Sequence, residues 1–124
     1  MCLVGRKFSA AGSEITLGFR KAAGTDDFHV LIWRPFRSTE VSKGKARLGL
    51  DNSAAVETRY LRGPVTVTNT ELTEIAAKGA QFAALDQAKT LQVVAGDFNS
   101  NFNLRGVGGA MKALDDCERK LLRR

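Results

Sequence analysis

The sequence predicts an α+β domain: an antiparallel β-sheet or sandwich of about seven strands, short helices near residues 70–88, and a C-terminal helix packed on the sheet. Two observations indicate this class. Apolar residues recur at every second position in most of the first half, as they do in half-buried strands. After Thr70 the composition becomes alanine-rich with helical spacing, and helical spacing returns after Gly108.

The length of 124 residues fits one domain, residues 1–124, with a core of ordinary size. Hydrophobic residues make up 44% and charged residues 26%, which is typical of a globular protein. No apolar run approaches the roughly 18 residues that span a membrane as a helix. No linker or low-complexity stretch divides the chain. These features exclude a helical membrane protein and a multidomain arrangement.

Six segments of the first half are expected to be strands. In the second of them Ile15, Leu17 and Phe19 alternate with polar residues, and glycine-containing turns flank the segment. The third has apolar residues on both faces and ends before Pro35, because proline cannot donate to a ladder. The six segments are residues 2–8, 14–21, 28–33, 45–50, 54–61 and 64–69.

The second half is expected to begin with helices. Thr70 is a plausible helix start and Gly79 a plausible end, with a second short helix at about 80–88. Residues 90–96 and 98–104 then form a predicted hairpin through a Gly-Asp turn. A final helix runs from Gly108 to Arg124. Its inner stripe has the spacing 4, 3 and 4 and consists of Ala110, Leu114, Cys117 and Leu121.

Four polar residues recur at every second position in the predicted hairpin: Asp97, Asn99, Asn101 and Asn103. A calcium loop of the EF-hand type needs glycine at its sixth position and glutamate at its twelfth, where this chain has Phe102 and Gly108. A strand explains the whole stretch, because its other parity is mostly apolar. Sugar binding by the amides is an alternative, but the aromatic residues lie on the other face.

The two cysteines, Cys2 and Cys117, lie near the two ends of the chain. They are too few for a disulfide scaffold, and no CxxC pair or histidine cluster suggests zinc. A bridge between them would stabilise an exported protein by about 4–5 kcal/mol in the chain-entropy account. In a reducing compartment they would be two buried thiols. We expect the Cys2–Cys117 disulfide.

The net charge of +6 permits contact with nucleic acid or another anionic surface. The basic residues, however, occur as scattered pairs along the predicted strands, which is typical of solvated sheet edges.

The sequence offers few residues that could act together as catalytic groups. His29 is the only histidine, and a Cys2–His29 nucleophile pair would need a free thiol at the end of the chain. Asp26 and Asp27 lie in turn sequence. The glycine-rich residues 106–109 lack the Lys-Ser/Thr of a phosphate loop. We therefore predict no catalytic residue, no metal site and no cofactor.

The segment from Ile32 to Arg37 is the strongest binding candidate. It combines the only tryptophan with a second aromatic residue and two arginines around a proline. Tryptophan and arginine are enriched at interface hot spots because both offer large amphipathic contact areas. The alternative is a strand end whose tryptophan covers the core. The candidate binding residues are Trp33, Arg34, Phe36 and Arg37.

The C-terminal stretch resembles the tail of small exported alphaproteobacterial proteins of the invasion-associated locus B family. The matching positions are Phe102, Leu104, Gly106, Ala110, Ala113 and Leu114. The resemblance covers about twenty residues. It implies a β-rich periplasmic or secreted protein and assigns no catalytic residues.

These observations predict a non-enzymatic, exported (periplasmic or secreted) binding or accessory domain. Its sheet face or the Trp33–Arg37 segment would contact a partner protein or a component of the cell envelope. The alternative is a basic intracellular domain that binds nucleic acid or nucleates an assembly.

Overall fold

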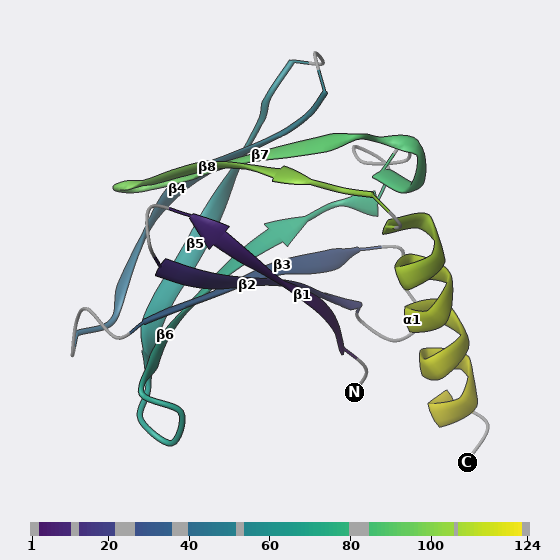
Figure 1. Cartoon of the computed structure of the whole chain (residues 1–124), viewed down its shortest axis with the longest axis horizontal. Coiled ribbons are helices and arrows are strands. Elements are labelled where there is room, and N and C mark those ends of the chain that lie inside the picture. Colours follow the sequence, from purple (N-terminus) through teal and green to yellow (C-terminus); the bar gives the residue numbers. More distant parts are fainter. Residues whose placement is uncertain are drawn as a thin grey trace.

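The computed structural model describes residues 3–10, 13–21, 27–35, 40–51, 54–79, 85–105 and 107–122. Within these ranges eight strands precede one long C-terminal helix (Figure 1). The 3-10 helix η2 (Leu85–Gln87) lies between the sixth and seventh strands. The strands are β1 (Leu3–Ala10), β2 (Ser13–Lys21), β3 (Phe28–Pro35), β4 (Ser42–Leu50), β5 (Val56–Val65), β6 (Thr70–Ala77), β7 (Thr90–Ala95) and β8 (Phe98–Asn103), and the helix is α1 (Val107–Leu122).

All eight strands belong to one antiparallel sheet with the order β1-β2-β3-β6-β5-β4-β7-β8. Two three-stranded meanders, β1–β2–β3 and β4–β5–β6, join where β3 pairs with β6, and the β7–β8 hairpin extends the sheet beside β4. The sheet curves until it is nearly a barrel (Figure 1). The expectation of a β-rich antiparallel body with a C-terminal helix is therefore confirmed.

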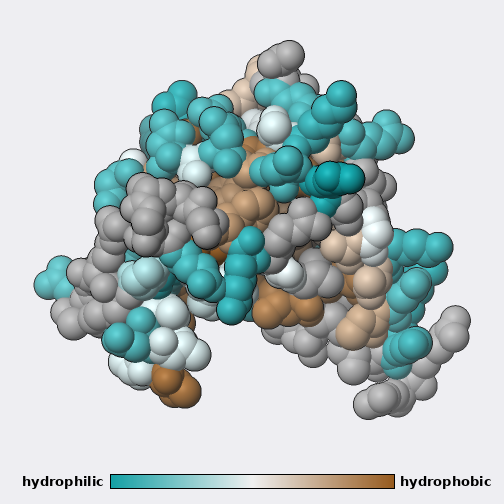
Figure 2. Space-filling view, in the orientation of Figure 1, coloured by the Kyte–Doolittle hydropathy of each residue, from teal (hydrophilic) through white to brown (hydrophobic). Residues whose placement is uncertain are grey.

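The barrel is left open between β1 and β8, the two end strands of the sheet order. The rings of Phe8 and Phe102 meet edge-to-face across this opening, with centroids 5.1 Å apart. On the face shown in Figure 2, hydrophobic surface lies between β8 and the β1–β2 hairpin, and hydrophilic residues border it. Side-chain packing thus holds the two end strands near each other.

One continuous hydrophobic core fills the inner face of the curved sheet. Its fully buried members come from five strands and the helix. Burying each of these side chains contributes about 1.5–3 kcal/mol relative to exposure. The largest of them are Phe102, Ile32, Leu48, Ile75, Leu91, Leu114, Val30 and Val93.

Helix α1 packs at the end of the barrel where β2 finishes and β3 begins. It contacts β1, β2 and η2. Leu114 enters the core with no exposed surface, and Asp115 accepts a short ion-paired hydrogen bond from Lys21. No helix in the described ranges is both long enough and apolar enough to cross a membrane.

The expected helix after Thr70 is wrong, because residues 70–77 form strand β6. Glu71, Thr73, Ile75 and Ala77 point inward and are buried, while the intervening side chains face outward. The polar Glu71 and Thr73 conceal the period-two pattern, and the alanines imitate a helix. Of the second expected helix, residues 80–84 lie outside the described residues, and residues 85–87 form only the 3-10 turn η2.

Three smaller corrections concern the sheet and the helix. The structure has eight strands in one curved sheet, where about seven in a sheet or sandwich were expected. The two segments expected at 54–61 and 64–69 are replaced by the single strand β5 and a turn over residues 66–69. On the expected inner stripe of α1, Leu114 is buried, but Cys117 is exposed.

Candidate functional site

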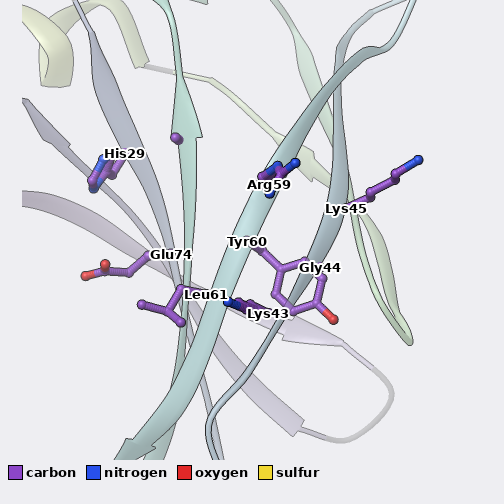
Figure 3. Close-up of a pocket in the computed structure, with 9 residues that line it drawn as sticks. His29, Lys43, Gly44, Lys45, Arg59, Tyr60, Leu61 and Glu74 are labelled. Carbon is purple, nitrogen blue, oxygen red and sulfur yellow. The ribbon is translucent and has the colours of Figure 1, made fainter.

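A groove of about 590 Å³ crosses the sheet over four adjacent strands, β3, β6, β5 and β4 (Figure 3). Most of its side chains have the outward parity of their strands, opposite to the core. β3 and β4 follow each other in the chain, but β6 and β5 lie between them in the sheet. The lining residues therefore come together only through this strand order. The lining residues are His29, Lys43, Gly44, Lys45, Arg59, Tyr60, Leu61, Glu74 and Ala76.

Three cations make one side of the groove basic. Lys43 and Lys45 are exposed on β4, and Arg59 is exposed on the neighbouring strand β5. Lys45 lies directly opposite Arg59 in the β4–β5 register. Like charges directly opposite each other destabilise a sheet. The structure therefore keeps a repulsive pair at this position.

Neutralisation of these cations is incomplete. Lys45 contacts Glu57 at 3.6 Å, but both side chains are more than half exposed, so the pair is weak. Within the described ranges, neither Lys43 nor Arg59 forms an ion pair with a carboxylate. The groove consequently presents a local positive field that favours an anionic group.

The other side of the groove contains an ordered polar chain. Arg20 on β2 contacts Nδ1 of His29 at 2.7 Å and Glu74 at 3.5 Å. Because a guanidinium group can only donate, His29 accepts through Nδ1 and carries its hydrogen on Nε2. With Nδ1 occupied by Arg20, Nε2 is the ring nitrogen that can donate a hydrogen bond at the groove.

The floor of the groove is partly apolar. Leu61 is 50% exposed and lies opposite Glu74, and Ala76 is also exposed. The ring of Tyr60 lies against Gly44 on the neighbouring strand, where a Cβ would approach the ring to 3.0 Å (Figure 3). The combination of three cations, one donor and a leucine suits a ligand that is both acidic and partly apolar.

The sequence-based binding candidates separate onto opposite faces of β3. Trp33 is half-buried and has the same outward parity as His29. Arg34 points inward, where it forms a buried ion pair with Glu71 at 2.5 Å. Phe36 and Arg37 lie outside the described residues, as does Cys2. Cys117 is exposed on α1.

The alternating polar row behaves as a strand face. Asn99, Asn101 and Asn103 are exposed along β8, while Phe98 and Phe102 are buried. Asp97 does not continue this row, because it lies in the β7–β8 turn and accepts a hydrogen bond from Arg62 at 2.8 Å. In the part of the chain that the structure describes, no three His, Cys, Asp or Glu side chains gather as metal ligands would.

The groove was not predicted from the sequence, since none of the candidate binding residues lines it, and its key cation Arg59 was not considered at all. Lys43, Lys45 and Arg47 belong to the scattered basic residues that were interpreted as solvated sheet edges, and Arg59 lies in a segment of mixed charge. A signal was present, because Arg59 has the outward parity of its strand. Only the β4–β5 register shows that it faces Lys45.

The chain matches no protein-family model, and no curated protein or solved structure is significantly similar to it.

Proposed function

We propose that this chain is a non-enzymatic, exported binding domain whose outer groove holds an acidic, partly apolar segment of a partner protein. The observation that carries the proposal is the repulsive pair Lys45 and Arg59 beside Lys43, with neither Arg59 nor Lys43 in an ion pair among the described residues. A bound carboxylate between Lys45 and Arg59 relieves their repulsion and forms charge-assisted hydrogen bonds.

The apolar part of the groove favours a polypeptide over a simple anion. Leu61 is half exposed at the centre of the lining, and its burial by a ligand is favourable. A peptide that alternates acidic and apolar side chains can contact the cations and Leu61 together. Nε2 of His29 can donate to a backbone carbonyl of such a segment.

Two features weigh against nucleic acid, the alternative partner. Glu74 lines the groove and Glu57 adjoins it, so a phosphate backbone would meet two carboxylates. Proteins that bind single strands usually stack bases on exposed aromatic rings, whereas the Tyr60 ring packs against Gly44. A peptide segment needs no stacking ring, and it can place one carboxylate between Lys45 and Arg59 with apolar residues, rather than a continuous charged backbone, beside Glu57 and Glu74.

The proposed export depends on the Cys2–Cys117 bridge. The contact of α1 with β1, the strand that begins one residue after Cys2, supports this bridge. The resemblance of the C-terminal stretch to invasion-associated locus B proteins points to the same compartment.

The test is fluorescence anisotropy with a labelled peptide of alternating glutamate and leucine. We expect the Lys45→Gln/Arg59→Gln variant to bind about tenfold more weakly, because each lost cation contributes about 0.5–1 kcal/mol. The matched control is Lys112→Gln/Lys120→Gln on α1, which removes the same charge from exposed positions. The control should retain wild-type affinity.

Two outcomes would overturn the proposal. Equal losses in the two variants would show a general effect of net charge rather than a site. Binding to an oligonucleotide that exceeds peptide binding and falls steeply with salt would favour the nucleic-acid alternative.

A further inference from the structure

A second cluster of charged side chains lies at the opposite end of β3 from α1. Arg34 at the end of β3 donates to Glu71 at the start of β6. Arg62 on β5 donates from Nε to Thr73 at 3.0 Å and from Nη1 to Asp97 at 2.8 Å. Its Nη2 donates to the carbonyl of Ala95 at 2.7 Å. The cluster therefore joins five elements: β3, β5, β6, β7 and the β7–β8 turn.

The buried members of this cluster carry excess positive charge. The side chains of Arg34, Arg62 and Glu71 are 8%, 10% and 4% exposed, so two cations face one buried anion. Asp97 supplies the second negative charge, but its side chain is 70% exposed. An unpaired buried charge is strongly destabilising. The two arginines thus need an anion that the core itself does not provide.

The two guanidinium groups are held in fixed orientations. Arg34 lies over the ring of Phe98 at 4.9 Å, and Arg62 lies over the ring of Tyr60 at 5.0 Å. Cation–π contacts of this kind orient a guanidinium plane and leave its edge available for hydrogen bonds. The cluster is consequently organised before any ligand arrives, which lowers the entropic cost of binding.

One donor in the cluster is unused. Nε of Arg34 is buried and has no hydrogen-bond partner, the one such side-chain atom among the described residues. A buried donor without a partner costs about 1–3 kcal/mol. Nη2 of the same residue lies 3.9 Å from Asp97, beyond hydrogen-bond distance. Asp97 therefore reaches Arg62 but leaves Arg34 incompletely satisfied.

We propose that this end of the barrel is a carboxylate-binding site, with Asp97 as its resident occupant. A ligand carboxylate replaces Asp97 at Arg62 and also reaches Arg34. The ligand class is a small carboxylic acid or the carboxyl terminus of a peptide, because the site is built around one carboxylate held by arginines.

The β7–β8 turn makes the exchange physically accessible. Only Gly96 and Asp97 separate the two strands, and both are exposed. Gly96 has a φ of 62°, and a Cβ there would lie 2.8 Å from the hydroxyl of Tyr60. That hydroxyl is thus beside the turn, where it can donate to an incoming carboxylate. The side chain of Asp97 is already 70% exposed, so it is not itself part of the buried core.

The electrostatics agree with this assignment. The hydrogen bond from Arg62 holds the pKa of Asp97 below its ordinary value, with further lowering by the charges of Arg62 and Arg34. The same field favours the ionised form of any carboxylate that takes the place of Asp97.

The test follows the Nε–H signals of Arg34 and Arg62 by NMR during titration with sodium acetate, with chloride keeping the ionic strength constant. In Asp97→Ala the resident carboxylate is absent. We therefore expect both signals to shift and saturate, with acetate affinity about tenfold higher than in wild type, the size of a charge-assisted hydrogen bond. Asp116→Ala, which removes an exposed carboxylate from α1, should behave as wild type.

A second variant guards against loss of folding. Asp97→Asn keeps an oxygen that accepts from Arg62 and removes only the charge, so acetate should raise its melting temperature more than that of Asp116→Ala. The groove variant Lys45→Gln/Arg59→Gln should show the acetate response of the wild type, which separates this site from the proposed peptide groove. Arginine signals that do not respond to acetate in folded Asp97→Ala or Asp97→Asn would overturn the proposal.

The source of the carboxylate is resolved with two short peptides, one with a free carboxyl terminus and one amidated. Tighter binding of the free form than of acetate would assign the site to a peptide terminus. Binding of acetate alone would assign it to small acids.

Discussion

At the residue scale, Asp51 shows how one carboxylate connects two strands that are distant in sequence. It ends β4 with a φ of 49°, a conformation that aspartate tolerates better than most residues. Its carboxylate accepts from the backbone N–H groups of Lys89 and Thr90, both at 2.9 Å, and its own N–H donates to the carbonyl of Thr90. Asp51 thus fixes the start of β7 beside the end of β4.

These contacts predict a dependence of stability on pH. The backbone hydrogen bond from Thr90, followed by that from Lys89, lowers the pKa of Asp51 in the folded state. A lowered folded pKa adds stability above the unfolded pKa, and this is lost as pH falls through the folded value. Asn at position 51 keeps the φ and an accepting oxygen but has no charge. We therefore expect Asp51→Asn to be less stable than wild type at pH 7.

The measurement is urea denaturation of both proteins from pH 7 to pH 2. The difference in free energy of unfolding should begin to shrink below about pH 4, where the Asp51 carboxylate of the unfolded chain binds a proton, and should be lost as pH falls through the lowered pKa of the folded state. A difference that stays constant over this range would contradict the proposed role of the charge.

Sequence reasoning at this scale succeeds where a residue follows the local pattern. The exposed amides of Asn99, Asn101 and Asn103 were expected from alternation alone, since Phe98 and Phe102 occupy the other parity. It fails for Arg34 and Asp97, whose partners are Glu71 and Arg62. Each pair is more than thirty residues apart, and no local pattern specifies such a pairing.

At the element scale, β6 shows why composition can mislead. An isolated segment with alanines and helical spacing favours a helix, but β6 is paired on both sides, with β3 and β5. Its backbone hydrogen bonds and the burial of Ile75 outweigh a weak intrinsic preference. The β7–β8 hairpin was predicted correctly, because a Gly-Asp turn between alternating segments is a strong local signal. Elements with local turn signals are therefore the ones that sequence identifies well.

Helix α1 depends on one core contact more than on its own sequence. Among the side chains of α1 whose burial the structure describes, Leu114 alone is fully buried, and the helix begins with three residues that include two glycines, so its intrinsic stability is low. We expect Leu114→Ala to lower the free energy of unfolding by about 2–5 kcal/mol through lost burial and an unfilled cavity. Chemical denaturation measures this loss.

The matched control is Lys112→Ala on the exposed face of the same helix. It should change stability by less than about 0.5 kcal/mol. Hydrogen exchange of the α1 amides should accelerate in Leu114→Ala and not in the control. Similar stability of the two variants would show that α1 does not depend on the core for its position.

At the scale of the whole molecule, the two ends of the barrel are closed in different ways. Helix α1 covers the end where β3 begins, and the arginine cluster covers the end where β3 finishes. The pairing of β3 with β6 and of β4 with β7 determines which side chains meet in both places. These pairings link segments that are distant in sequence. Sequence periodicity predicts the separate strands but not their order in the sheet, so it could not predict the groove that crosses β3, β6, β5 and β4.

The Cys2–Cys117 bridge is a prediction at this same scale, since it would join the first strand to the last helix. Leu3 at the start of β1 is paired with Arg20, and the next residue, Lys21, is ion-paired with Asp115 on α1. These successive contacts connect the start of β1 to the turn of α1 that precedes Cys117. A bridge here would close nearly the whole chain, which corresponds to about 4–5 kcal/mol in the chain-entropy account.

Intact mass under non-reducing conditions tests the bridge, because a disulfide removes two hydrogens from the reduced chain. Reductant should then lower the melting temperature of the wild type and leave Cys2→Ser/Cys117→Ser unchanged. If protein prepared under oxidising conditions keeps two titratable thiols, β1 is held only by its pairing with β2 and by contacts such as that between Phe8 and Phe102. The proposed export would then lose its main physical support, whereas the groove and the arginine cluster, which contain neither cysteine, would remain.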